Sequence, residues 1–336
     1  MRYLRPLALT LVIGLLAACA PQGTFEVGMV TDLGPINDRS FNETTWNGLV
    51  RAQEELPVAA DYRTSIDETD HAPNIEAFLE QETDMIVTVG FLLGDTTLAY
   101  ARENPDVQFA IVDFAYDVAI PENLLSITFQ TDEAAFLAGY LAAGMTQTGT
   151  VGTFGGLNIP TVTIFMDGFT AGVTYYNETH NTDVDVIGED IFAGSFTSRE
   201  AGQTIGADLI AQGADIIMPV AGETGLGAAE AAGNNPGTLI IGVDSDWCET
   251  SPEVCPVVLT SVMKRLDVAV YDAVEDAQDG GFDTQTYVGD LTNGGVDLAP
   301  FYTYEDDIPA ELLSELEQLR LSISVEAIAI EDYLER

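Results

Sequence analysis

The chain has 336 residues, of which 46% are hydrophobic. It contains 55 acidic and only 11 basic residues, so that its formal net charge is −44. This length exceeds what one hydrophobic core usually supports, and with 31 glycines the composition predicts a folded α/β protein with two lobes. The charge excludes nucleic acid as a partner, because a phosphate backbone requires a basic surface, and it is otherwise typical of a surface adapted to salt or to solubility.

The N-terminal stretch MRYLRPLALTLVIGLLAACA resembles the export signal of a bacterial lipoprotein. Two arginines precede an apolar run that is too short to cross a bilayer as a helix. The letters LAAC resemble the lipobox, where cleavage leaves a lipid-modified cysteine. We therefore predict a signal peptide over residues 1–18 and a lipidated tether over residues 19–24, which begins at Cys19 and anchors the body on the extracytoplasmic face of the cell membrane. The alternative is an ordinary signal peptide with a chance cysteine.

Short apolar runs then alternate with amphipathic stretches, which predicts strands and helices in βα order. The expected strands of the first half cover residues 24–32, 84–90, 107–113 and 124–130, and the expected helices cover residues 40–56, 74–82, 95–104 and 131–145. In the second half, the expected strands cover residues 149–156, 184–192, 214–220 and 238–244, and the expected helices cover residues 168–178, 199–212 and 225–233. The tail adds a strand at residues 286–291 and a helix within residues 309–335. Because the alternation runs twice, we expect two lobes, each with a parallel sheet that helices cover on both faces.

Charged or otherwise unusual residues follow several of these strands. In doubly wound sheets, ligands bind beyond the carboxyl ends of the strands, and two such lobes that face each other form a cleft, which is the favoured place for a small-molecule site. The residues at these positions are Asp32, Asp113, Gly222 and Asp244, together with Lys264, which follows a further apolar run, VVLTSV, at residues 257–262. We therefore predict that they converge at a cleft between the lobes.

Two phenylalanines lie where strands lead into helices, in TDLGPINDRSFNETTWNGL and in GSFTSREAGQ. Phe41 follows a cap at Asp38 or Ser40 and precedes Asn42, and Phe196 lies just before a helix in the second half. Aromatic rings from opposite lobes could stack on both sides of one planar ligand ring, and the amide offers a donor and an acceptor. The structural alternatives are a hydrophobic staple for Phe41 and packing of Phe196 onto its own lobe.

The segment AGETGLGAAEAAG invites comparison with a dinucleotide-binding loop, since Gly222, Gly225 and Gly227 lie between a strand and a helix. The fingerprint G-x-G-x-x-G requires a third small residue, but that position holds Glu230. A pyrophosphate would also meet a very acidic molecule. We therefore predict a tight turn, with close approach of the Gly222 backbone to a ligand, rather than a cofactor site.

Lys264 is the only lysine of the chain. The pattern around it predicts a position at the start of a helix, where the helix dipole disfavours a cation unless an anionic or electron-rich group meets it. An ammonium group offers three donors, so that Lys264 and Asp244 together could hold vicinal hydroxyls across a cleft. The alternative is a surface salt bridge, which does not explain why lysine occurs here and nowhere else. We therefore predict a ligand-binding role for Lys264.

Cys248 and Cys255 close a short loop that contains proline. In an exported protein, such a pair favours a disulfide. Zinc is the alternative, but His71 and His180 have no ligand spacing to each other or to these cysteines. No nucleophile–base pair stands out in the sequence, so we predict neither a metal site, nor a cofactor, nor catalysis.

Four stretches together carry a family resemblance: TDLGPINDRSFNETTWNGL, NPDVQFAIVD, GGLNIPTVTIFMDGFTAGV, and IIGVDSD with the later LTSVMKRLDVAV. With the lipobox, they make the chain similar to the basic membrane protein family of ABC-transporter substrate-binding lipoproteins, of the purine nucleoside receptor type. The resemblance extends to about Asp297. The segment DSDWCETSPEVC departs from the family pattern in its Trp247 and its cysteine pair.

The resemblance implies a type I periplasmic-binding-protein fold, an α/β architecture of two doubly wound parallel-sheet lobes joined by a three-strand hinge. We place the three crossings between lobes near Ile127, Leu259 and Asp283. The N-terminal lobe would then comprise residues 25–127 plus 259–283, and the C-terminal lobe residues 128–258 plus 284–336.

The resemblance also implies how a purine base would be bound. Phe41 and Phe196 would stack on the base from both sides. Asp113 would form a hydrogen bond with the edge of the base, with Asn42 nearby, and Asp32 would lie at the edge of the pocket.

By the same resemblance, Asp244 and Lys264 would hold the ribose hydroxyls, with the Gly222 backbone alongside. We therefore expect a monomeric lipoprotein that captures a nucleoside and delivers it to the permease and ATPase subunits of an ABC importer. The alternatives are a receptor for a sugar or another small solute, and a nucleoside-processing or NAD-dependent enzyme on a doubly wound fold.

Overall fold

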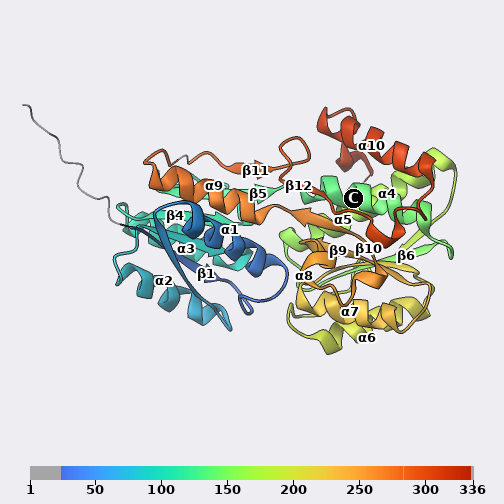
Figure 1. The fold of residues 1–336 in the computed structure, drawn as a ribbon, viewed down its shortest axis with the longest axis horizontal. Helices are drawn as coiled ribbons and strands as arrows, with labels where there is room; N and C mark the ends of the chain where they lie inside the picture. The colour runs from blue at the N-terminus through green and yellow to red at the C-terminus, as the bar shows by residue number, and fades with distance from the viewer. Residues whose placement is uncertain (1–23, 283, 334–336) are drawn as a thin grey trace, which may run out of the picture.

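The computed structural model describes residues 24–282 and 284–333, which form two lobes side by side along the longest axis of the molecule (Figure 1). The predicted signal peptide, Cys19 and all but the last residue of the predicted tether lie outside the described residues, and so does Asp283. Each lobe is built around one six-stranded sheet.

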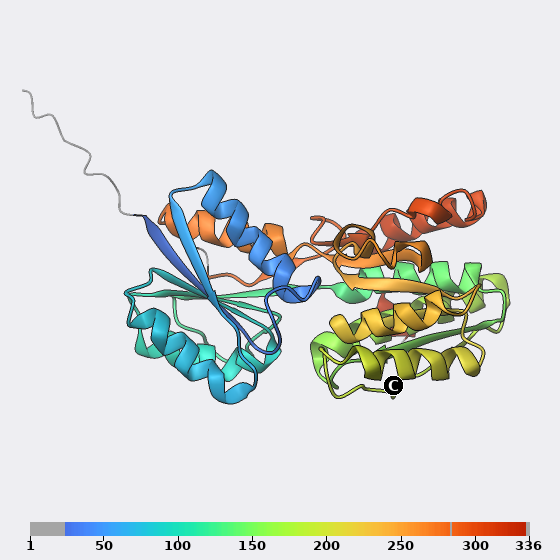
Figure 2. The ribbon, with the colours of Figure 1, turned by 60° about the horizontal axis from the view of Figure 1, so that its bottom comes forward.

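The sheet of the first lobe has the strand order β11-β5-β4-β3-β1-β2, and all of its pairings are parallel. Its strands are β1 (Phe25–Thr31), β2 (Val58–Arg63), β3 (Met85–Val89), β4 (Gln108–Val112), β5 (Leu124–Phe129) and β11 (Tyr287–Gly289). Its helices are α1 (Phe41–Glu55), α2 (His71–Leu79), α3 (Gly94–Glu103) and α9 (Leu266–Gln278). Helices α1 and α9 cover one face of this sheet and α2 and α3 cover the other (Figure 2). The expected doubly wound arrangement is therefore present.

The sheet of the second lobe has the order β12-β10-β9-β8-β6-β7, and only the pairing of β12 with β10 is antiparallel. Its strands are β6 (Thr150–Gly155), β7 (Asp185–Ile187), β8 (Ile216–Val220), β9 (Leu239–Asp244), β10 (Val258–Lys264) and β12 (Val296–Leu298). Its helices are α4 (Thr131–Met145), α5 (Pro160–His180), α6 (Arg199–Ala211), α7 (Glu223–Gly233), α8 (Trp247–Thr250) and α10 (Ala310–Ser324). Helices α4 and α5 lie on one side of this sheet and α6 and α7 on the other (Figure 1).

The chain crosses between the lobes three times, as expected, but at positions shifted from the predicted ones. The first crossing joins β5 to α4 after Phe129, close to the prediction at Ile127. The second follows Lys264 rather than Leu259, because the apolar strand β10 pairs along its length with β9 of the second sheet. The third lies between β11 and β12, beyond the predicted Asp283, because β11 pairs with β5 of the first sheet. Residues 259–264 thus belong to the second lobe and residues 287–289 to the first, opposite to the predicted boundaries.

Two further details of the chain differ from the expectation. Lys264 is the last residue of β10 and not part of a first helical turn, because its backbone continues the pairing with β12. Helix α5 begins at Pro160, well before the expected start at residue 168, because proline fits the first helical turn, where its missing N–H leaves no intrahelical bond unmade.

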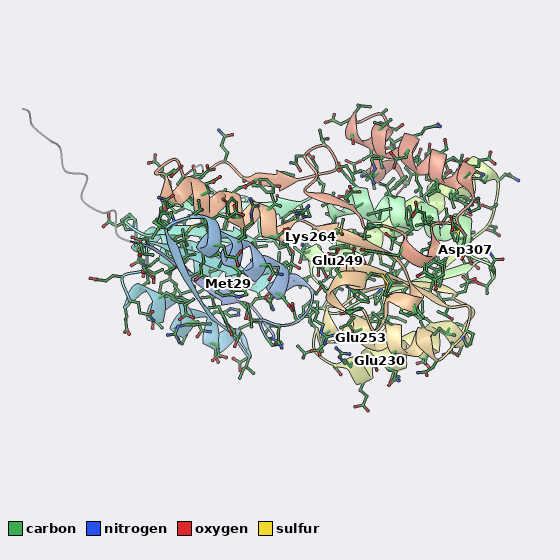
Figure 3. The ribbon with its side chains drawn as sticks, in the orientation of Figure 1. Met29, Glu230, Glu249, Glu253, Lys264 and Asp307 are labelled. Carbon is green, nitrogen blue, oxygen red and sulfur yellow. A yellow bond between two sulfur atoms is a disulfide. The ribbon has the colours of Figure 1, made fainter. Side chains whose placement is uncertain are left out.

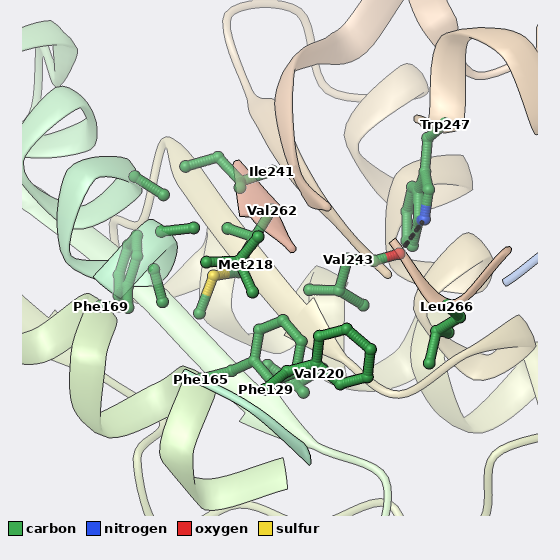
Figure 4. Close-up of a cluster of buried hydrophobic side chains, with 14 of the residues drawn as sticks. Phe129, Phe165, Phe169, Met218, Val220, Ile241, Val243, Trp247, Val262 and Leu266 are labelled. Carbon is green, nitrogen blue, oxygen red and sulfur yellow. Dashed lines mark hydrogen bonds between the residues drawn. The ribbon is translucent and has the colours of Figure 1, made fainter. Parts of the chain in front are cut away.

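The hinge side chains are part of a buried cluster that extends through both lobes. Phe129, at the end of β5, and Leu266, at the start of α9, belong to the same cluster of buried side chains as Phe165, Val220 and Val243 (Figure 4). Because these five residues come from segments on both sides of two crossings, the core anchors the hinge where the lobes meet.

Candidate functional site

A cavity lies where the carboxyl ends of the strands of the two lobes face each other. The residues that the sequence predicts to bind a ligand all line this one cavity: Asp32, Phe41, Asn42, Asp113, Phe196, Gly222, Asp244 and Lys264. Both lobes therefore contribute to the candidate site.

Lys264 extends into the region where the two lobes meet (Figure 3). Its Nζ donates to Oδ2 of Asp113, at the end of β4, over 2.5 Å, and the two side chains are only 2% and 8% exposed. The surface salt bridge considered above is therefore wrong. Asp244 ends β9, the neighbouring strand of the same sheet, so Lys264 and Asp244 do not face each other across the cleft as predicted. The pair of Lys264 with Asp113 joins the two lobes, because β4 and β10 belong to different sheets.

Three aromatic rings surround the ammonium group of Lys264. Its Nζ lies 4.9 Å from the ring centre of Phe41, 5.2 Å from that of Phe129 and 5.7 Å from that of Phe165. Such positions over ring faces attract a cation, most strongly where water is excluded. The buried charge is thus compensated by one carboxylate and by the rings.

Asp32 is held at the end of β1 by the backbone around it. The His71 imidazole donates through Nε2 to the carbonyl of Asp32 over 2.8 Å, which requires the proton on that nitrogen. The carboxylate accepts from the N–H of Leu33 over 2.6 Å. Burial raises the pKa of Asp32 to about 7, and the negative charge of Asp113 adds to this rise. Asp32 therefore titrates near neutral pH.

Close contact with Asp32 also explains a glycine of the cavity wall. Gly90 follows β3 with φ of 122°, and a side chain built on it would place its Cβ 2.0 Å from Oδ2 of Asp32. Neither the conformation nor the space would allow another residue there. Gly222 shows the predicted turn, since its φ of 54° and ψ of −131° suit glycine and leave its backbone at the cavity.

Asp113 and Asp244 occupy equivalent places at the ends of strands in the two lobes. Both have left-handed backbones, with φ of 64° and 66°. Aspartate tolerates this conformation better than most residues, and such conformations concentrate at binding sites. Burial raises the pKa of Asp244, whereas the nearby charge of Lys264 and the hydroxyl of Ser40, which donates to Asp244 Oδ2 over 2.8 Å, both lower it.

The start of α1 is capped by one of the two residues considered for this role. The carboxylate of Asp38 accepts from the backbone N–H groups of Ser40, Asn42 and Glu43 over 2.9–3.0 Å. Burial nevertheless raises the pKa of Asp38 to about 6. Ser40 does not cap the helix, since its hydroxyl is directed to the other lobe. The cap at Asp38 fixes the start of α1, and the first residue of this helix, Phe41, lies at the cavity.

Asn42 has only part of its amide engaged. Its side chain is 3% exposed, and Nδ2 donates to the carbonyls of Leu33 and Pro35 over 3.1 Å and 3.3 Å. Its Oδ1 has no hydrogen-bond partner among the described residues. The donor thus shapes the loop after β1, and the acceptor is buried without a partner among the described residues.

Phe196 packs on its own lobe and also lines the cavity. Its ring fills the space next to Gly156, where an added Cβ would lie 2.4 Å from the ring, so that it packs on its own lobe. It also lines the cavity, as do two aromatic residues that sequence reasoning missed, Phe91 and Phe165. Phe91 follows the end of β3 by two residues and could have been found by its place after a strand. Phe165 lies inside α5, where nothing in its surroundings distinguishes it from a core residue.

Cys248 and Cys255 are joined by a disulfide. In residues 24–282 and 284–333, no group of three or more His, Cys, Asp and Glu side chains is arranged to hold a metal ion. Over the same residues, no helix has the length and apolar character that a membrane span requires.

The architecture defines a class of protein. Two doubly wound lobes joined by three crossings, with one cavity that both line at their strand ends, are typical of a binding protein that closes around a small solute. The chain belongs to the Bmp family of PnrA-like ABC transporter substrate-binding proteins, whose model matches residues 25–332. It is therefore an extracytoplasmic binding protein and not an enzyme. The family resemblance predicted from the sequence is confirmed.

Relatives and solved structures agree with this assignment. The chain is 32% identical over 317 residues to a CD4+ T-cell-stimulating antigen of Listeria monocytogenes, with 89% of this chain and 86% of the relative covered. It is 32% identical over 291 residues to the ABC transporter nucleoside-binding protein BmpA of Lactococcus lactis, with 81% of each covered. An ABC transporter solute-binding protein from Aeropyrum pernix K1 superposes with a TM-score of 0.83 at 26% identity, covering 91% of this chain and 92% of the other. The predicted type I periplasmic-binding fold is therefore also confirmed.

Proposed function

We propose that the protein captures a purine nucleoside in the cavity between its lobes and delivers it to the permease and ATPase subunits of an ABC importer. The observation that carries this proposal is the convergence of four phenylalanines, an amide, several carboxylates and one lysine on a single cavity. The similarity to a relative named as a nucleoside-binding protein supports the same ligand class.

Each part of a nucleoside has a suitable partner in the cavity. Phe41 and Phe196 offer ring faces for the base, and stacking of this kind contributes about 1–3 kcal/mol per base. The carboxylates of Asp32 and Asp113 would accept from N–H groups at the edge of the base, with Asn42 nearby. The base would therefore lie between the two rings.

The sugar would lie next to the second lobe. Asp244 can accept from vicinal hydroxyls, and Lys264 has two N–H donors left beyond the one given to Asp113. The Gly222 backbone approaches the same region. The ribose would thus be held on the side opposite to Asp32.

The charge of the cavity favours a neutral nucleoside over a nucleotide. Asp32, Asp38, Asp113 and Asp244 line it together with a single cation, Lys264, which is already paired. A phosphate group would be repelled by these carboxylates and by the net charge of −44 of the whole chain.

Lobe closure around the ligand would be the transport signal, since a ligand that contacts both halves stabilises the closed arrangement. We further propose that the protein works as a monomer, anchored through a lipid on Cys19 after removal of residues 1–18. The sequence features LAAC and the preceding apolar run support this anchor.

Titration calorimetry with adenosine, guanosine and inosine tests the proposed ligand class. Saturable binding at one site per chain is expected for at least one of them, with much weaker binding of the corresponding nucleoside monophosphate and of free ribose. Tight binding of a sugar without any response to nucleosides would overturn the proposal in favour of a sugar receptor.

A further inference from the structure

The segment Asp246–Val257, which holds Trp247 and the cysteine pair, is firmly fixed to the second lobe. Trp247 is 1% exposed, and its Nε1 donates to the carbonyl of Val243 over 3.0 Å (Figure 4). Its backbone N–H donates to Oγ of Ser261 in β10 over 3.1 Å. The buried indole thus anchors the start of the segment in the core of the second lobe.

The rest of the segment has little freedom either. The disulfide between Cys248 and Cys255 closes it into a short loop. The carboxylate of Asp246 caps its first turn by accepting from the N–H of Cys248 over 2.9 Å. Near its end, the hydroxyl of Tyr304 donates to the carbonyl of Pro256 over 2.6 Å. The side chains at the tip of the loop are therefore held in one position.

The tip presents Glu253 to the first lobe. Its carboxylate forms an ion pair with the guanidinium of Arg39, from the loop just before α1. The carbonyl of Arg39 also accepts a hydrogen bond from Oγ of Ser245 over 3.0 Å, and Ser245 immediately precedes the segment. The side chains of Arg39 and Glu253 are 41% and 52% exposed, so the pair lies at the rim and not inside the cavity, which neither residue lines.

We propose that the segment Asp246–Val257 is a latch that holds the two lobes together over the cavity and slows the release of the ligand. Arg39 and Glu253 come from different lobes, so their pair exists only while the lobes are close. A rigid loop loses little freedom when it makes such a contact, which strengthens an otherwise weak exposed pair. The effect falls on the dissociation rate, as for most contacts made only in the bound state. The proposal rests on ligand capture between the lobes but not on the identity of the ligand.

Stopped-flow release of the purine nucleoside that binds in calorimetry, from the full chain, tests the latch. Glu253→Gln is expected to raise the dissociation rate about two- to fivefold, which is the range of an exposed pair. The matched control is Glu249→Gln, which removes the same charge from an exposed residue of the same segment (Figure 3) and should leave the rate unchanged. Arg39→Gln should act like Glu253→Gln, and the two together should add nothing further.

The disulfide gives an independent variant. In Cys248→Ser/Cys255→Ser, the loop is free to move, so the rate should rise by a similar factor and Glu253→Gln should then have no additional effect. If this variant does not fold, the comparison of Arg39→Gln, Glu253→Gln and their combination decides the question alone. Additive effects of those two changes would overturn the latch.

A measurement without ligand separates the latch from the proposed function. Hydrogen exchange at the backbone amides of residues 39–43 should be faster in Glu253→Gln than in Glu249→Gln. If no nucleoside binds, the proposed function fails and the exchange rates still decide the latch. Equal behaviour of Glu253→Gln and Glu249→Gln in hydrogen exchange, or in release where a nucleoside binds, would overturn it.

Discussion

Replacement of Lys264 by methionine tests the buried ion pair that joins the lobes. The side chains of Lys264 and Asp113 are 2% and 8% exposed, so the change would leave the carboxylate of Asp113 buried without its counter-charge. Breaking a buried pair in this way usually costs about 3–5 kcal/mol, whereas an exposed pair is worth only about 0–1 kcal/mol. We therefore expect the free energy of unfolding to fall by about 3–5 kcal/mol.

The double variant Lys264→Met/Asp113→Asn is the control for this prediction. With both charges removed, no uncompensated carboxylate remains, and most of the lost stability should return. Urea unfolding at neutral pH, followed by circular dichroism, measures both variants. A loss of no more than about 1 kcal/mol in the single variant, or a double variant as unstable as the single one, would refute the buried pair. Both variants should lose affinity for the ligand, since Lys264 lines the cavity.

Three further predictions concern the cavity wall. Phe41→Ala should weaken nucleoside binding by about 1–3 kcal/mol through lost stacking, and an unchanged calorimetric titration would remove Phe41 from the site. Asp32 has its pKa raised from 3.8 to about 7, so the folded state retains a proton that the unfolded chain releases, and stability should fall as pH rises from about 4 to 7. Asp32→Asn should remove this part of the pH dependence of the free energy of unfolding, which amounts to roughly 4 kcal/mol over that range at about 1.4 kcal/mol per pH unit. If the wild type and Asp32→Asn show the same dependence of unfolding free energy on pH, the burial of that carboxyl is contradicted. Gly90→Ala should cost at least about 1–3 kcal/mol, since a left-handed backbone and contact with Asp32 both oppose the methyl group, and a wild-type urea midpoint would show that the site adapts.

Much of the fold follows from the sequence because its signals are local. The helix at residues 131–145 matches α4, and the strand at 238–244 nearly matches β9, because each is a regular pattern with clear ends. The strand β2 was missed because it is a short edge strand, half exposed, without a continuous apolar run. The positions of the crossings depend on which sheet a strand joins. The apolar pattern of residues 258–264 predicts a strand but does not indicate which lobe's sheet it joins.

The sequence was enough to predict which residues line the candidate site, but not which of their side chains contact one another. Strand ends converge in any doubly wound sheet, so the places of Asp32, Asp113 and Asp244 followed from the element order alone. That Lys264 bonds Asp113 rather than Asp244 depends on how the lobes meet, which no local pattern records. The role of Arg39 in a contact between lobes was hidden for the same reason.

A crystal structure of the protein with a bound purine nucleoside tests the central claim most directly. The account predicts the base between the rings of Phe41 and Phe196, with the ribose hydroxyls within hydrogen-bond distance of Asp244 and Lys264. A nucleoside bound outside the cavity between the lobes, or bound there with neither ring against the base, would contradict it.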